Sequence, residues 1–284
     1  RVHQHRRFIV GALIFGIGLS KKVLLADPLG SIADFGFDEA YSQLPSSLLW
    51  MTVLAYTLQI YFDFSGYSDM AVGLARMFGF RFPRNFNHPY TATSITDFWR
   101  RWHITLSKWM GRYLYVPLGG NRVSSTRNFI NLWVVFIVSG FWHGAAWNFL
   151  LWGCFHGLFI SLDKVFIKFR IVNRVHWSIK QGLTFFIVLN SWVLFRANDM
   201  NQVGYFYKKM YFEFEHSYKQ LFWLDYSPYQ ITILLIASVL AIFPFRRHRV
   251  IHDLGRRLFR NTTFSLYLTC GMILVCSAFI FANS

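Results

Sequence analysis

The chain has 284 residues, of which 54% are hydrophobic and 20% aromatic, while only 15% are charged. A soluble domain carries about 25% charged residues, so this composition excludes an ordinary soluble protein and predicts an all-α, polytopic integral membrane protein. Lysine and arginine number 29 against 13 acidic residues, a net charge of +16. The basic residues fall between apolar runs, which indicates positive-inside topology and contact with anionic lipid, with no nucleic-acid partner.

Apolar segments recur along the whole chain. We expect membrane segments near residues 8–25, 47–63, 128–142, 145–162, 178–195, 230–245 and 263–281. Several are shorter than the roughly 20 residues that a straight spanning helix needs. Short segments interrupted by glycine predict tilted or re-entrant helices around a tunnel. We interpret residues 1–284 as a single membrane-embedded domain and expect it to be an N-terminally truncated fragment.

The connecting segments alternate in charge, which predicts the side of the membrane on which each lies. Basic side chains dominate four segments, which we place in the cytoplasm: residues 1–7, 76–127, 163–180 and 246–261. Residues 27–47 hold four acidic and no basic side chains, and residues 196–229 hold four of each sign. We place these two segments outside. The ordering requires a tight hairpin between residues 128–142 and 145–162, with His143 near its tip.

The motif YFDFSGYSDM places Asp63 and Asp69 at the end of an apolar run. On a continuous helix a spacing of six residues would separate the two side chains by about 120°, but Gly66 between them predicts a break. Two interpretations remain open. The carboxylates orient a catalytic base or line the tunnel, or they are satisfied buried groups at a helix junction.

Residues 94–115 carry aromatic and apolar side chains at spacings of three and four, with basic residues distributed around them. This pattern predicts an amphipathic interfacial helix along the inner leaflet. The alternative, compatible with anchoring, is a basic rim that binds an anionic ligand. The candidate residues of this rim are Arg100, Arg101, Lys108 and Arg112. We interpret His103, in the same segment, as a surface group.

An ionisable residue, His143, lies in a long apolar stretch between Trp142 and Gly144. Polar side chains are costly in hydrocarbon, so such a residue faces protein or a water-filled cavity. Apolar surroundings disfavour the imidazolium, and a neutral imidazole is a competent general base near pH 7. The small residues Gly140 and Gly144–Ala146 leave room for a substrate. The alternative is a core histidine hydrogen-bonded to a neighbouring helix.

A second histidine, His156, follows in the next apolar segment. It is either a second polar residue lining the tunnel or a packed core histidine. Trp142 and Asn148 are further candidates for supporting or tunnel-lining roles. We expect no metal site, because the sequence has no HExxH pattern and the spacing of His143 and His156 is not that of an HxxxH pair. The three cysteines lie in apolar segments without metal-ligand spacing, and we interpret them as packing residues.

Several long motifs in fixed order resemble the membrane-bound O-acyltransferase (MBOAT) family, and within it the bacterial alginate O-acetyltransferase branch. The resemblance spans about residues 8–197 and rests on KKVLLAD (Lys21–Asp27), the stretch Leu54–Tyr90, FWRRWHITLSKWMGRYLYVPLGGNR (Phe98–Arg122), FWHGAAW (Phe141–Trp147) and SWVLFRA (Ser191–Ala197). In this family the histidine of the WHG motif is catalytic. That position falls on His143.

The resemblance implies a multi-pass acetyltransferase of the cytoplasmic (inner) membrane with an MBOAT-like helical core. It implies that an acetyl group moves from a cytoplasmic thioester, acetyl-CoA, to hydroxyls of an exported polysaccharide, directly or through an extracytoplasmic acetyltransferase partner. Acyl-CoA would be a substrate, with Arg100, Arg101, Lys108 and Arg112 as the candidate donor-binding residues, and no bound cofactor is expected. One alternative is D-alanyl or other acyl transfer to teichoic acid or lipid. An alternative from another class is a membrane transporter or channel, although internal repeats and paired mid-membrane charges are not evident.

Overall fold

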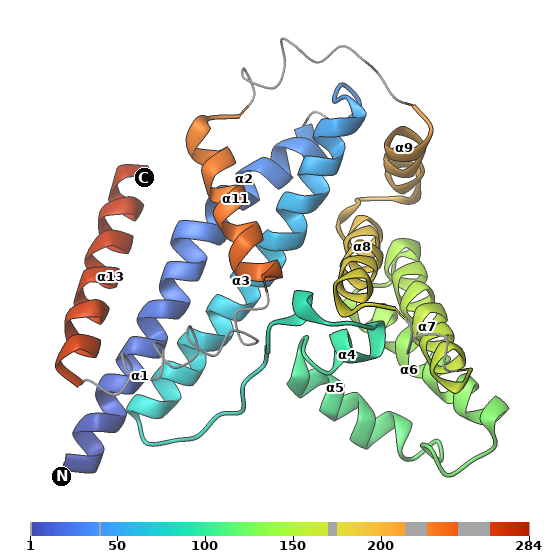
Figure 1. Ribbon diagram of the computed structural model, residues 1–284, viewed down its shortest axis with the longest axis horizontal. Coiled ribbons are helices and arrows are strands. Elements are labelled where there is room, and N and C mark those ends of the chain that lie inside the picture. Colours follow the sequence, from blue (N-terminus) through green and yellow to red (C-terminus); the bar gives the residue numbers. More distant parts are fainter. Residues whose placement is uncertain (1, 40, 170–174, 214–225, 244–261, 284) are drawn as a thin grey trace. The chain divides into compact units, whose positions relative to one another are not determined.

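The structure is a computed structural model that describes residues 2–39, 41–169, 175–213, 226–243 and 262–283 (Figure 1). Within these ranges every regular element is helical, which confirms the all-α class. Four of the described helical stretches are long and apolar enough to cross a membrane: His5–Asp38, Trp147–Ile167, Trp177–Arg196 and Thr263–Phe281. The basic segment 246–261 lies outside the described residues, as do residues 214–225 of the segment expected outside.

Five of the expected membrane segments correspond closely to single helices. These are α6 (Ser125–His143), α7 (Trp147–Lys168), α8 (Trp177–Arg196), α11 (Pro228–Ile242) and α13 (Thr262–Asn283). The α11 helix has only 15 residues, fewer than the roughly 20 of a straight span. Two segments expected as loops contain helix. They hold α2 (Asp27–Asp34) and α9 (Met200–Tyr211).

Contacts divide the chain into two compact units, and each is described by itself. The first unit comprises residues 1–32, 55–87 and 226–284, and the second comprises residues 33–54 and 88–225. The single-domain organisation stays a prediction.

In the first unit, α1 (Val2–Ser20) packs against α13 (Figure 1) and passes through a π-helical turn, η1 (Lys21–Ala26), into α2. The α3 helix (Ser46–Met77) is continuous, so the expected break at Gly66 is wrong. A Cβ atom at Gly66 would lie 2.7 Å from the carbonyl oxygen of Gly18. The glycine therefore serves close helix packing and does not interrupt the helix.

The second unit is built around α6 and α7, which pack against each other, with α8 lying against α7. Its shorter elements are η2 (Phe35–Glu39), η3 (Pro89–Thr91), α4 (Ile95–Trp99), α5 (Ile104–Met110) and η4 (Gly111–Tyr115). Large aromatic side chains form its core: Phe37, Tyr90, Phe98, Trp152, Trp192 and Phe206 are fully buried.

The single amphipathic helix expected over residues 94–115 is wrong, because the chain breaks between α4 and α5. His103 at the break has a φ of 41°, in the left-handed region, and its Nδ1 accepts a hydrogen bond from the Leu106 N–H at 3.4 Å. This bond caps α5. The break lets Phe98 and Trp102 point into the core, whereas Trp109 is 54% exposed.

Candidate active site

The α6–α7 hairpin expected from the charge pattern is confirmed, and two glycines explain how close its helices are. A Cβ atom at Gly140 would lie 2.3 Å from the carbonyl oxygen of Phe149, and one at Gly153 would lie 2.3 Å from that of Phe136. Only glycine allows the two backbones to approach so closely. The hairpin places His143 at the last position of α6, directly before a three-residue link to α7.

His143 is half-buried and surrounded by aromatic rings. Its ring centroid lies 5.2 Å from that of Trp152 and 5.0 Å from that of Phe195, both in edge-on contact. The neighbouring Trp142 also contacts it, at 4.9 Å, but is 60% exposed. Within the described ranges neither ring nitrogen of His143 has a hydrogen-bond partner. The imidazole is therefore held by packing while its nitrogens stay available to a ligand.

Polar contacts fix the end of α8 beside His143. Asn148, which is buried, donates from Nδ2 to the carbonyl oxygen of Ala197 at 2.8 Å and ties the start of α7 to the end of α8. The amide predicted to line a tunnel is thus engaged by the backbone. This contact anchors the segment that carries Phe195, which packs on the His143 ring.

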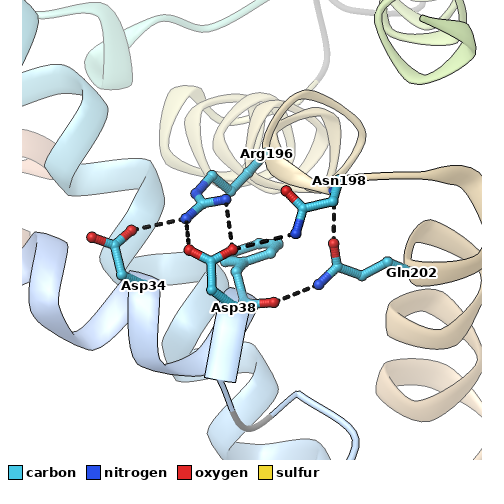
Figure 2. A network of polar contacts seen from close by, with 6 residues as sticks. Asp34, Asp38, Arg196, Asn198 and Gln202 are labelled. Carbon is cyan, nitrogen blue, oxygen red and sulfur yellow. Dashed lines mark hydrogen bonds and ion pairs between the residues drawn. The ribbon is translucent and has the colours of Figure 1, made fainter.

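A second set of contacts holds the same segment (Figure 2). Arg196 donates to Asp34 at 2.9 Å and to Asp38 at 2.5 Å. Asn198 donates to Asp38 from its side chain and to Gln202 from its backbone N–H. A guanidinium that binds two carboxylates is a strong, directional anchor. The network was missed in the sequence because its acidic and basic members are about 160 residues apart.

His156 is fully buried in α7. The indole N–H of Trp99 donates to its Nδ1 at 3.2 Å. Trp152 packs edge-on against His156 at 4.9 Å and against His143 at 5.2 Å, so one indole lies in contact with both imidazoles.

A cavity of about 480 Å³ lies between α4, α5, η4, α6 and α7. Most of its wall is apolar; its polar and basic lining residues are Thr96, Arg100, Ser107, Lys108, Tyr115, Asn121, Ser139 and Lys164. Trp99 and Phe136 also line it, and both pack against His156. The cavity has the size of a small-molecule site and adjoins the aromatic cluster that holds the two histidines.

The structure separates the four candidate donor-binding residues. Arg100 and Lys108 line the cavity, whereas Arg101 and Arg112 do not. Arg101 instead donates to Asp97 at 2.9 Å and to Thr91 at 3.2 Å, and Arg112 is exposed in η4. Lys164, which also donates to Asn128, was missed because it seemed only one charge of a basic loop. A lysine near the end of an apolar helix could have been recognised as a candidate in the sequence, because its ammonium group reaches the membrane interface.

His103 is half-buried and does not lie on the surface as the sequence suggested. Burial lowers the pKa of His103 from its ordinary value of 6.5.

Asp63 and Asp69 belong to the first unit, while His143 belongs to the second. Both carboxylates form ion pairs with lysines of η1: Asp69 with Lys21 at 2.6 Å, and Asp63 with Lys22 at 2.7 Å. Each carboxylate is thus paired with a lysine, and the two ion pairs join η1 to α3. Among the described residues no group of His, Cys, Asp and Glu could hold a metal ion.

Comparison with known proteins identifies the family. The model of the membrane-bound O-acyltransferase family matches residues 1–198. The chain belongs to the MBOAT family. This assignment confirms the resemblance drawn from the motifs and establishes a multi-pass membrane protein.

The relatives of this MBOAT protein include proteins named as O-acetyltransferases, probable O-acetylases and D-alanyltransferases. It is 47% identical to a peptidoglycan O-acetyltransferase of Helicobacter pylori over 69% of this chain and 38% of the relative. It is 41% identical to a probable alginate O-acetylase, AlgI, of Pseudomonas aeruginosa over 87% of this chain and 47% of the relative. A teichoic acid D-alanyltransferase of Bacillus subtilis is 30% identical over 46% of this chain. The chain spans about half the length, or less, of the curated relatives it matches.

Proposed function

We propose that this MBOAT protein transfers an acyl group from a thioester to a hydroxyl, with His143 as the general base. The proposal rests on the surroundings of the His143 ring. The ring is fixed by Trp152 and Phe195, neither nitrogen is used by the described protein, and small residues follow it. A base must have a free nitrogen within reach of the proton it removes.

The imidazole of His143 can carry out both proton transfers of the reaction. His143 takes the proton of the acceptor hydroxyl, and the oxygen attacks the carbonyl carbon of the thioester. The carbon–sulfur bond then breaks, and the imidazolium returns the proton to the leaving thiolate. General-base catalysis of this kind contributes about 10²- to 10⁴-fold in rate.

We assign acetyl-CoA as the donor and the cavity beside His156 as its binding site. Arg100, Lys108 and Lys164 give that cavity a positive rim for phosphate groups, while its apolar wall suits the uncharged arm of the donor. The charge pattern puts Arg100 and Lys108 in a segment predicted to be cytoplasmic, where acyl-CoA is made. The membrane is accordingly the inner membrane.

The acceptor in this proposal is a hydroxyl of an exported polysaccharide, reached directly or through an extracytoplasmic acetyltransferase partner. The acetyltransferase relatives support it, because the alginate and peptidoglycan enzymes align with 87% and 69% of this chain. The D-alanyltransferase relative aligns with 46%, so D-alanyl transfer is the weaker alternative. Family membership likewise favours an enzyme over a transporter or channel.

The decisive experiment replaces His143. His143→Gln keeps size and hydrogen bonding but cannot take a proton, so release of coenzyme A from acetyl-CoA by membranes should fall by at least about 10²-fold. His5→Gln, which changes an exposed histidine of the first unit, is the matched control. Both variants are compared at equal membrane protein level. Near-normal activity of His143→Gln would show that His143 is structural and that the proposed function of this site is wrong.

A further inference from the structure

The bonding of His156 fixes which of its nitrogens carries the proton. An indole N–H can only donate, so His156 Nδ1, which accepts the Trp99 indole N–H at 3.2 Å, is unprotonated. The neutral imidazole then carries its proton on Nε2. Nε2 is buried and has no hydrogen-bond partner in the part of the chain that the structure describes. His156 is therefore a buried donor held in one orientation by Trp99.

An unpaired buried donor destabilises the fold, and an apolar side chain at the same position would avoid that cost. Its neighbours are rings: Phe98, Phe136, Trp152 and Phe155 pack around it. Among the described residues, the indole N–H groups of Trp152 and Trp192 in the same cluster are also buried and unpaired. Within the described part of the chain, the cluster thus holds three donors that have no acceptor. A water molecule fits poorly, because it would need acceptors for its own two protons.

Ring contacts link His156 both to the cavity wall and to His143. Two cavity residues, Trp99 and Phe136, contact His156, and Trp152 contacts both histidines. An acyl group that passes from a donor in the cavity to a hydroxyl at His143 would meet this buried N–H.

We propose that the Nε2–H of His156 binds the carbonyl oxygen of the acyl group. The proposal rests on the proposed function and assigns the acyl subsite, with a carbonyl oxygen of a thioester or ester as the ligand chemistry. A carbonyl oxygen accepts hydrogen bonds and donates none, which is what the cluster lacks. As the oxygen becomes negative during attack, a fixed donor in a dry site stabilises it strongly, by about 10²- to 10³-fold in rate for one donor. Trp99 is the positioning residue that holds the donor.

The first test separates this role from a structural one. The double variant Trp99→Phe/His156→Phe removes the indole–imidazole bond as a pair, so it should keep the melting temperature of the wild type. It should lower coenzyme A release from acetyl-CoA by about 10²-fold. In His156→Gln the amide can accept from Trp99 and donate to the ligand, so it should be at least tenfold more active than His156→Phe. The proposal would be overturned if the double variant lost both stability and activity and His156→Gln were no more active than His156→Phe.

The second test uses ligands that differ only at the carbonyl. Acetyl-CoA has the acceptor oxygen, whereas S-ethyl coenzyme A has a methylene in its place. His156→Phe should weaken binding of acetyl-CoA and leave binding of S-ethyl coenzyme A unchanged. An equal effect on both ligands, or on neither, contradicts the assignment. If instead the proposed function fails, the wild type itself binds neither ligand and His143→Gln changes nothing, an outcome distinct from a failure of His156 alone.

Discussion

Gly18 of α1 and Gly66 of α3 touch through their backbones. A Cβ atom at Gly18 would lie 2.6 Å from the carbonyl oxygen of Gly66, and one at Gly66 would lie 2.7 Å from that of Gly18. Seven residues away on each helix, Gly11 and Gly73 repeat the reciprocal contact, at 2.7 Å and 2.6 Å. Small residues at helix interfaces are the usual way in which membrane helices gain van der Waals contact. These two pairs hold α1 against α3 within the first unit.

Gly66→Ala should therefore destabilise the protein, because the added methyl group would overlap the carbonyl of Gly18 and force α1 and α3 apart. The matched control is Gly271→Ala in α13, where an added Cβ meets nothing within 4 Å. The control should be neutral or stabilising, since alanine is favoured over glycine in a helix by about 1 kcal/mol. Melting temperature in detergent is the measurement. A Gly66→Ala variant as stable as Gly271→Ala would contradict the close contact.

Replacing the basic residues of the cavity should weaken donor binding. Arg100→Gln and Lys108→Gln should each raise the KM for acetyl-CoA by up to roughly fivefold, the upper range for an exposed ion pair. The effect should shrink at high salt because exposed charges are screened. Arg112→Gln is the matched control, since Arg112 is exposed in the same segment but does not line the cavity. Equal effects of all three variants would point to membrane anchoring instead.

His103 should make the fold sensitive to acid. Burial lowers its pKa below 6.5, so below pH 6.5 the unfolded chain binds a proton that the folded chain resists. Its contribution to stability is complete above pH 6.5 and is lost as the pH falls towards the folded-state pKa. His103→Asn tolerates the left-handed backbone and can still cap α5, but it cannot titrate.

The melting temperature of the wild type should consequently fall more between pH 7.5 and pH 5.5 than that of His103→Asn. His103→Ala serves as the second comparison, because it loses the cap, worth about 1 kcal/mol, and should be less stable at both pH values. Identical pH dependence in the wild type and His103→Asn would mean that His103 does not contribute to acid sensitivity.

The charge pattern predicts that residues 76–127 are cytoplasmic and that α9 is outside. In a background without the three native cysteines, Arg122→Cys should resist an impermeant thiol reagent added to intact cells, whereas Asn201→Cys should react. Both positions are exposed, so access to the reagent is decided by the membrane alone. The opposite labelling pattern would invert the orientation and remove the cytoplasmic assignment of the cavity.

The sequence could predict helices well because apolar length and glycine or charge at the ends are local signals. The α7, α8 and α13 helices lie close to the segments expected from hydropathy, and the α6–α7 hairpin follows from charge alternation. Local signals failed where side chains meet distant partners. Gly66 was expected to break a helix, because the sequence does not reveal its contact with Gly18, which is 48 positions away. Residues 94–115 were expected to form one helix because the periodicity of Phe98 and Trp102 does not reveal the turn at His103.

The sequence by itself determined the class, the family and the choice of His143, since composition and contiguous motifs carry that information. Only the tertiary structure decided what surrounds His143. It separated Arg100 and Lys108, which line the cavity, from Arg101, which pairs with Asp97. It also left His156 with one nitrogen bonded to Trp99 and the other unpaired. Hydrogen bonds and burial depend on which helices meet, and residues such as Trp99 and His156, 57 positions apart, come together only when the chain has folded.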